Sequence, residues 1–199
     1  MESTRIERLP IFALNTVLFP RGTLALKVFE PRYVEMTKAC LRDGTPFGVC
    51  AIREGREVGD PALTAGIGCT ARIVDWELPH PNLFHLGAAG EQRFRIVANE
   101  VDALGLIVCE AELLPTEAST EAPDALCRHV LASAISQIGA DRFPAPVALD
   151  DAAWVSYRLA EMLPIALPLR QQLLETDSAQ ARLALLHDLL VQAGAAPSS

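Results

Sequence analysis

The sequence of 199 residues lacks several features that mark common protein classes. No run approaches the roughly 18 to 20 consecutive apolar residues that a membrane-spanning helix needs. The N-terminal residues show no secretory signal, and the cysteines form no C-x-x-C pair. The five cysteines lie at wide, irregular spacings: Cys40, Cys50, Cys69, Cys109 and Cys127. An odd set of unpaired cysteines is typical of a reducing compartment. We therefore expect a soluble, cytoplasmic protein with no membrane-spanning part.

Lysine is scarce, and this scarcity limits the catalytic hypotheses. Lys27 and Lys38 are the only two lysines in the sequence, and neither lies in a phosphate-binding G-x-x-x-x-G-K-[ST] loop. There is also no G-x-S-x-G, the pattern that exposes the nucleophilic serine of many hydrolases. A Ser–Lys dyad would have to use one of these two lysines, which local patterns place on a strand and on the solvent side of a helix. We therefore expect a non-catalytic protein that binds no cofactor.

Concentrated positive charge is also missing. The net charge is −8, with 12 basic and 15 acidic residues in 1–113 and 5 basic and 10 acidic residues in 114–199. Proteins that follow a nucleic-acid backbone usually present a basic face. The composition therefore argues against nucleic acid as a partner. A local basic group of Arg72, Arg93 and Arg95 keeps RNA binding open as an alternative.

Two further chemical hypotheses stay open at this point. Cysteine catalysis would pair a thiol with a histidine, so an unrecognised hydrolase is a second, weaker alternative. The four histidines are His80, His85, His129 and His187. A metal site can be imagined from His80 and His85 with Asp75 and Glu77, but the spacing matches no characteristic zinc pattern. A polar hairpin tip is the better interpretation, so we predict no metal site.

Up to about residue 114, the sequence is punctuated by glycine and proline and carries short alternating apolar runs that are typical of strands. These runs cover residues 24–29, 47–52, 69–74, 93–97 and 106–111. We interpret the stretch Gly87–Gly90 as a tight turn between strands. Several short strands at this spacing favour a sandwich or a small barrel.

One helix is predicted within this strand-rich part, over residues 31–43. Pro31 suits the first helical position, and Gly44 suits the left-handed conformation that ends a helix. The segment before it is interpreted as the joint where a strand becomes a helix. In this joint Arg32 is expected to pair with a carboxylate or a strand-end carbonyl, and Tyr33 to cover the core.

The composition and periodicity of the sequence change after residue 114. Residues 115–123 are small and polar without periodicity, as in a linker. Helical patterns follow, with one helix ending at Gly139, one ending at Pro164, a short one starting at Pro168, and one capped by Asp177. We therefore predict a strand domain over 1–114, a linker over 115–123, a helical bundle over 124–194 and a frayed tail over 195–199.

Five motifs, in order and spacing, resemble the N-terminal substrate-binding domain of Lon proteases. They are Leu9–Phe12, Val17–Pro20, Phe29-Glu30-Pro31-Arg32-Tyr33, Gly68–Ala71 and Gly90-x-x-Arg93-Phe94-x-Ile96. The resemblance implies an α+β fold: a PUA-like six-stranded pseudo-barrel with one inserted helix, followed by a small C-terminal helical bundle. It also implies a stand-alone form without the ATPase and protease parts of Lon. Ala13 and Ala25 depart from the family pattern, which often has proline at these positions.

The resemblance implies a protein that binds unfolded or extended polypeptides, as an adaptor or regulator in protein quality control. An ATP-dependent protease is a candidate partner, and homo-oligomerisation stays open. We expect an apolar contact surface at the tip of a hairpin, formed by Trp76, Leu78 and Phe84, with Phe47 as a weaker candidate. Open strand edges are a second expected feature, because they can pair with an extended peptide.

Overall fold

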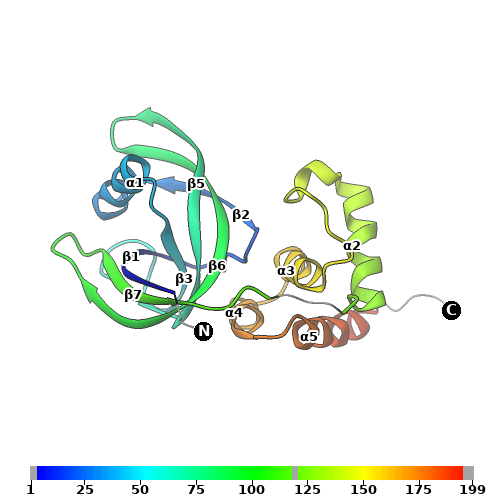
Figure 1. Cartoon of the computed structure of the whole chain (residues 1–199). Coiled ribbons are helices and arrows are strands. Elements are labelled where there is room, and N and C mark those ends of the chain that lie inside the picture. Colours follow the sequence, from blue (N-terminus) through cyan, green and yellow to red (C-terminus); the bar gives the residue numbers. More distant parts are fainter. Residues whose placement is uncertain (1–3, 118–120, 195–199) are drawn as a thin grey trace. The chain divides into compact units, whose positions relative to one another are not determined.

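The computed structural model describes residues 4–117 and 121–194 of the chain. The chain divides into two compact units, the barrel unit Met1–Pro115 and the helical unit Thr116–Ser199. Figure 1 shows that strands and one helix build the first unit and that helices build the second. The predicted tail, 195–199, and the centre of the predicted linker, 118–120, lie outside the described residues.

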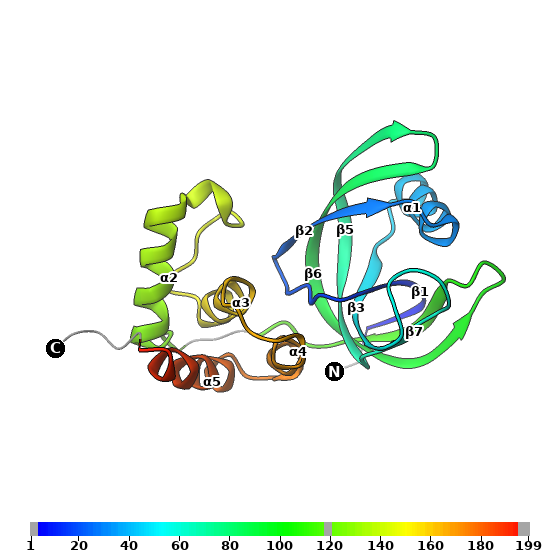
Figure 2. The ribbon, with the colours of Figure 1, turned by 180° about the vertical axis from the view of Figure 1, so that it is seen from behind.

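The barrel unit is a strongly curved sheet that closes on itself (Figure 2). Its strands are β1 Arg5–Leu14, β2 Thr23–Val28, β3 Phe47–Glu54, β4 Leu63–Thr64, β5 Ile67–His80, β6 Leu83–Val101 and β7 Ile107–Leu113. The strand order is β1-β7-β6-β5-β3-β4, and a parallel pairing of β1 with β3 closes the ring. The predicted α+β pseudo-barrel is confirmed, with one strand more than predicted because β4 has two residues and leaves no sequence pattern.

β5 and β6 form a long hairpin that dominates the sheet. Its turn lies at Pro81 and Asn82, and Asn82 has a φ of 67°. The predicted tight turn at residues 87–90 is wrong, since this stretch lies within β6 and pairs with β2 and β5. Gly90 serves close packing instead, because a Cβ at this position would collide with the carbonyl oxygen of Phe19.

Helix α1, Pro31–Asp43, packs against the main core of the barrel unit and has the predicted bounds. Gly44 ends it in the left-handed conformation, with a φ of 65°. The helix buries an apolar face that includes Tyr33, Val34 and Met36 in the main core. The ring of Tyr33 stacks on that of Phe12, with 4.0 Å between their centroids. The helix therefore belongs to the core and is not an appendage of the sheet.

The helical unit contains four α-helices among its described residues. They are α2 Ala125–Ile138, α3 Ala152–Met162, α4 Leu167–Glu175 and α5 Ala179–Gln192, with a short 3-10 turn at Ala140–Arg142. The predicted ends at Gly139 and before Pro164 are confirmed. The predicted cap at Asp177 is wrong by one residue, because Ser178 accepts the hydrogen bond from the Ala181 N–H. No described helix is both long and apolar enough to cross a membrane.

A buried ion pair organises the interior of the helical unit. The guanidinium of Arg182, on α5, donates to both carboxylate oxygens of Glu117, at 2.7 and 2.6 Å. It also donates to Ser156 Oγ on α3, and it lies 4.1 Å from the centre of the Tyr157 ring. The Tyr157 hydroxyl donates to Glu117 as well. Glu117, which precedes α2, is thereby tied to two helices of its unit.

Candidate functional site

A groove of about 370 Å³ runs along β2 in the barrel unit. We call it the β2 groove; its lining is Phe12, Leu14, Thr16, Leu24, Ala25, Leu26, Lys27, Val28, Phe29, Glu30, Tyr33, Glu57 and Val58. Five consecutive residues of β2, 24–28, belong to this lining. Neighbouring side chains of a strand point to opposite faces of the sheet. A groove that touches five in a row therefore follows the edge of the strand.

The edge of β2 is free of a second strand. Within residues 4–117 and 121–194, β2 pairs with β6 and with no other strand. The turn before β2 sets its pairing: Gly22 N–H donates to Phe19 O, Arg21 N–H donates to Gly90 O, and Gly90 N–H donates to Gly22 O. Arg21 adopts a φ of 61° in this turn, as the first residue of a bulge usually filled by glycine. The turn therefore fixes which β2 backbone groups face β6.

Apolar side chains line the β2 groove, and two large ones among them are more than half exposed. Phe29 is 56% exposed and Val58 is 54% exposed, whereas Phe12 and Tyr33 belong to the buried core. Burial raises the pKa of the Tyr33 hydroxyl, despite the opposing charge of Arg32. The floor of the groove is therefore uncharged, and its rim offers exposed apolar surface.

The rim is held in place by Arg32 and Glu30 at the start of α1. Arg32 donates to the Glu30 carboxylate at 2.9 Å, to Gly105 O at 3.1 Å and to Glu57 O at 3.4 Å. Glu30 also accepts from the Gly59 N–H at 3.3 Å. The predicted pairing of Arg32 with a carboxylate and carbonyl groups is confirmed. These bonds fix the loop that carries Val58 against the first turn of the helix.

The four apolar residues singled out in the sequence separate into two pairs. Trp76 and Leu78 lie on β5, and each is 50% exposed. Phe84 and Phe47 are buried in the main core, so their side chains are not available to a ligand in this conformation. The Trp76 ring covers Phe84, with 6.1 Å between the ring centres. None of the four lines the β2 groove.

Sequence reasoning missed the exposed residues of the groove, Phe29 and Val58. The alternation over 24–29 includes Phe29, but neither the alternation nor the family motif indicates that this side chain is exposed. Val58 lies in a loop where no periodic signal exists. The available signal is a large apolar residue, Phe29, two positions before the proline that starts a helix.

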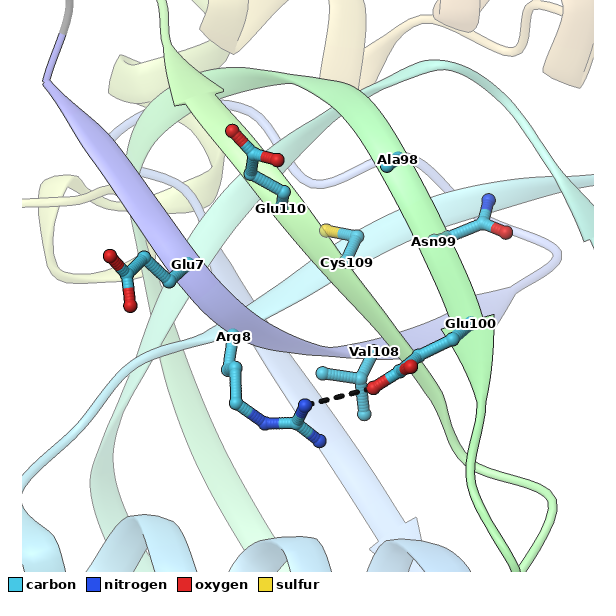
Figure 3. A pocket seen from close by; sticks show the side chains of 8 residues that line it. All are labelled: Glu7, Arg8, Ala98, Asn99, Glu100, Val108, Cys109 and Glu110. Carbon is cyan, nitrogen blue, oxygen red and sulfur yellow. Dashed lines mark hydrogen bonds and ion pairs between the residues drawn. The ribbon is translucent and has the colours of Figure 1, made fainter.

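A second, smaller hollow of about 240 Å³ lies where β1, β6 and β7 meet (Figure 3). It is lined by Glu7, Arg8, Ala98, Asn99, Glu100, Val108, Cys109 and Glu110, and Arg8 pairs with Glu100 at 2.8 Å. Burial raises the pKa of the Cys109 thiol to about 12, so this thiol stays protonated. Neither this hollow nor the β2 groove is lined by a histidine. The pairing of thiol with histidine that a cysteine hydrolase requires is not found at either place.

One cysteine does lie near a His–Asp pair, in the helical unit. His187 Nδ1 is 3.1 Å from Asp124 Oδ1, and Asp124 caps α2 by accepting from the Cys127 N–H. Cys127 is fully buried, and burial together with the Asp124 charge raises the pKa of its thiol to about 12. This arrangement disfavours a thiolate. The described residues also contain no group of three or more potential metal ligands.

The three arginines of the RNA alternative do not form an open basic patch. Arg93 is buried. Arg72 pairs with Glu91 at 2.8 Å and donates to Gly44 O, and Arg95 pairs with Glu112 at 3.3 Å. Nearby carboxylates therefore offset the charge that would attract a phosphate backbone.

Comparison with known proteins identifies the family. Residues 8–192 match the family described as the ATP-dependent protease La (LON) substrate-binding domain. A Lon N-terminal domain protein from Xanthomonas campestris is 33% identical, with a TM-score of 0.76 and coverage of 92% of this chain and 98% of that one. The N-terminal domain of Mycobacterium avium complex Lon protease shares the fold at 19% identity, with a TM-score of 0.62 and coverage of 92% and 97%. A search of curated proteins found no match. On the family match and the 33% identity, this chain belongs to the Lon substrate-binding domain family.

Proposed function

We propose that this chain is a non-catalytic module that binds unfolded or extended polypeptides in the β2 groove. The observation that carries the proposal is an apolar groove, rimmed by exposed Phe29 and Val58, that follows a free strand edge. Unfolded polypeptides expose apolar side chains and unpaired backbone groups, and such a groove accepts both. Membership of a substrate-binding family supports the same class of ligand.

The half-exposed Trp76 and Leu78 form a second contact surface in this proposal. A longer unfolded chain reaches both places, which strengthens binding without new contacts at either one. A polypeptide-binding module of this kind acts as an adaptor or regulator for an ATP-dependent protease. Five free, buried thiols suit work in a reducing cytoplasm.

The test is a titration of a fluorescent, reduced and carboxymethylated test protein with the purified chain, followed by anisotropy. We expect saturable binding by the wild type. The double variant Phe29→Ser/Val58→Ser should bind about tenfold more weakly, since it loses apolar contact area worth at least 1 to 2 kcal/mol.

The matched control is Val101→Ser, which changes an equally exposed valine on β6 outside the β2 groove. It should bind as tightly as the wild type. Absence of saturable binding by the wild type, or equal weakening in the control, would contradict the proposal.

A further inference from the structure

We propose that the bound polypeptide joins the sheet as an additional strand on the free edge of β2, and that it carries a carboxylate beside Lys27. This inference rests on the proposed function and specifies its ligand. The ligand is an extended segment with apolar residues at every second position and one acidic residue on the opposite face.

The backbone hydrogen bonds between β2 and β6 decide which groups of β2 remain unpaired. The N–H of Gly90 donates to Gly22 O. From this bond the β2–β6 register continues without interruption, from Thr23 opposite Ala89 to Val28 opposite Phe84. Hydrogen-bonded and non-bonded pairs alternate in an antiparallel ladder. Leu24, Leu26 and Val28 therefore bond to β6.

Thr23, Ala25 and Lys27 then turn their N–H and C=O groups away from β6, toward the groove. Within the described part of the chain, residues 23–28 form no backbone hydrogen bond beyond the β2–β6 ladder. Unpaired groups in a row along a strand are the template on which an extended chain adds.

The burial of the β2 side chains predicts how apolar and polar side chains alternate in the ligand. Leu26 and Val28 are buried while Ala25 and Lys27 are exposed, so the two faces of β2 differ in polarity. An added strand continues this pleat. Its inward side chains meet the apolar floor at Phe12 and Leu14, and its outward side chains stand beside Ala25 and Lys27.

The charged side chains of the groove favour an acidic residue in the ligand. Three ionisable groups other than tyrosine line the groove: Lys27, Glu30 and Glu57. Glu30 is neutralised by Arg32, and Glu57 accepts the Asn15 N–H at 2.6 Å. Lys27 forms no ion pair with any described residue, and its cross-strand neighbour on β6 is His85. A carboxylate on the added strand therefore supplies a charge partner that Lys27 lacks on its open side. The net charge of −8 restricts the ligand to few acidic groups.

The primary test uses the wild-type chain and fluorescent peptides of about eight residues, long enough to cover the whole edge of β2. The parent peptide alternates valine and threonine and has one aspartate on the threonine face. A series carries a single N-methyl group at successive positions. Strand addition predicts weaker binding at every second position, roughly threefold to tenfold per lost hydrogen bond.

The matching protein variant is Ala25→Pro, which removes an edge N–H and leaves the bonds to β6 intact. It should weaken binding of the parent peptide roughly tenfold. Thermal melting shows whether the proline variant is folded, and the N-methyl series decides the question independently of this variant.

Reversing the charge at position 27 and in the peptide tests the preference for an acidic residue. Lys27→Glu should weaken binding of the aspartate peptide about fivefold and strengthen binding of a matched arginine peptide. Equal affinities of both peptides for both proteins would overturn the choice of an acidic residue.

The outcomes separate the two proposals. If the peptides bind but N-methylation shows no alternation, strand addition is overturned and binding in the β2 groove stands. If neither the peptides nor the unfolded test protein bind, the proposed function itself falls. If light scattering shows a dimer that the peptide does not dissociate, a second copy of the chain occupies the edge and strand addition by substrate is overturned.

Discussion

Arg32 joins three segments of the barrel unit through one side chain. It is 6% exposed, and its guanidinium bonds to the start of α1 and to carbonyl groups of two loops. It also lies 4.8 Å from the centre of the Tyr33 ring. These contacts are structural, because Arg32 is not part of the groove lining.

Arg32→Ala should therefore lower stability more than it lowers affinity. Removing one partner of a buried ion pair costs about 3 kcal/mol in the free energy of unfolding, since Glu30 loses its cation. Urea unfolding measures this loss, and anisotropy with the unfolded test protein measures affinity. A variant that unfolds as the wild type does but binds poorly would make Arg32 a ligand-binding residue.

Glu161 gives the helical unit a pH dependence. It pairs with Arg158 at 2.8 Å. Burial raises the pKa of its carboxyl to about 7, against the opposing charges of Arg158 and Arg170. In the unfolded chain the pKa returns to about 4.5. The stability contributed by the bound proton is therefore complete below about pH 4.5 and is lost as the pH rises through about 7.

The prediction is a comparison of wild type and Glu161→Gln by urea unfolding at about pH 5 and pH 8. The free energy of unfolding of the wild type should fall more between these two conditions than that of the variant, whose amide does not titrate. Parallel pH profiles for the two proteins would show that Glu161 does not titrate in this range.

At the level of the element, the β5–β6 hairpin carries both buried and exposed apolar side chains. Phe84→Ala should cost about 3 to 5 kcal/mol in the free energy of unfolding, because it leaves a cavity in the main core. Leu78→Ser should change the same quantity by less than about 1 kcal/mol, because half of that side chain already faces solvent. Chemical denaturation of both variants checks the contrast. Similar losses would mean that Leu78 is also a core residue.

Sequence reasoning predicts an element well where the signal is local. The bounds of α1 followed from Pro31 and Gly44, which act within a few residues of themselves. The burial of Phe47 and Phe84 did not, because an aromatic residue on a strand is buried or exposed according to what the facing elements bring to it. The same limit hid the β2 groove, whose lining comes from β1, β2, α1 and a distant loop. Ala25 stands where the family pattern often has proline. Unlike proline, it has a backbone N–H, which the proposed strand addition uses.

At the level of the whole molecule, the two compact units suggest separate folding. The barrel unit has its own apolar core, and the helical unit has its own buried Arg182–Glu117 pair. We expect a fragment of residues 1–115 to fold alone and to bind the unfolded test protein within about threefold of the whole chain, because the β2 groove lies inside it. Circular dichroism and anisotropy of the fragment test this. An unfolded fragment would show that the barrel unit depends on the helical one.

The burial of all five cysteines has a practical consequence for experiments in solution. Thiol-directed reagents need an accessible thiolate, and all five of these thiols are buried. A single cysteine introduced on the rim of the β2 groove would therefore be the preferred site of alkylation. Fluorophores, spin labels or photo-crosslinkers can be attached there without first removing a native cysteine, so the path of a captured polypeptide can be mapped on the intact protein.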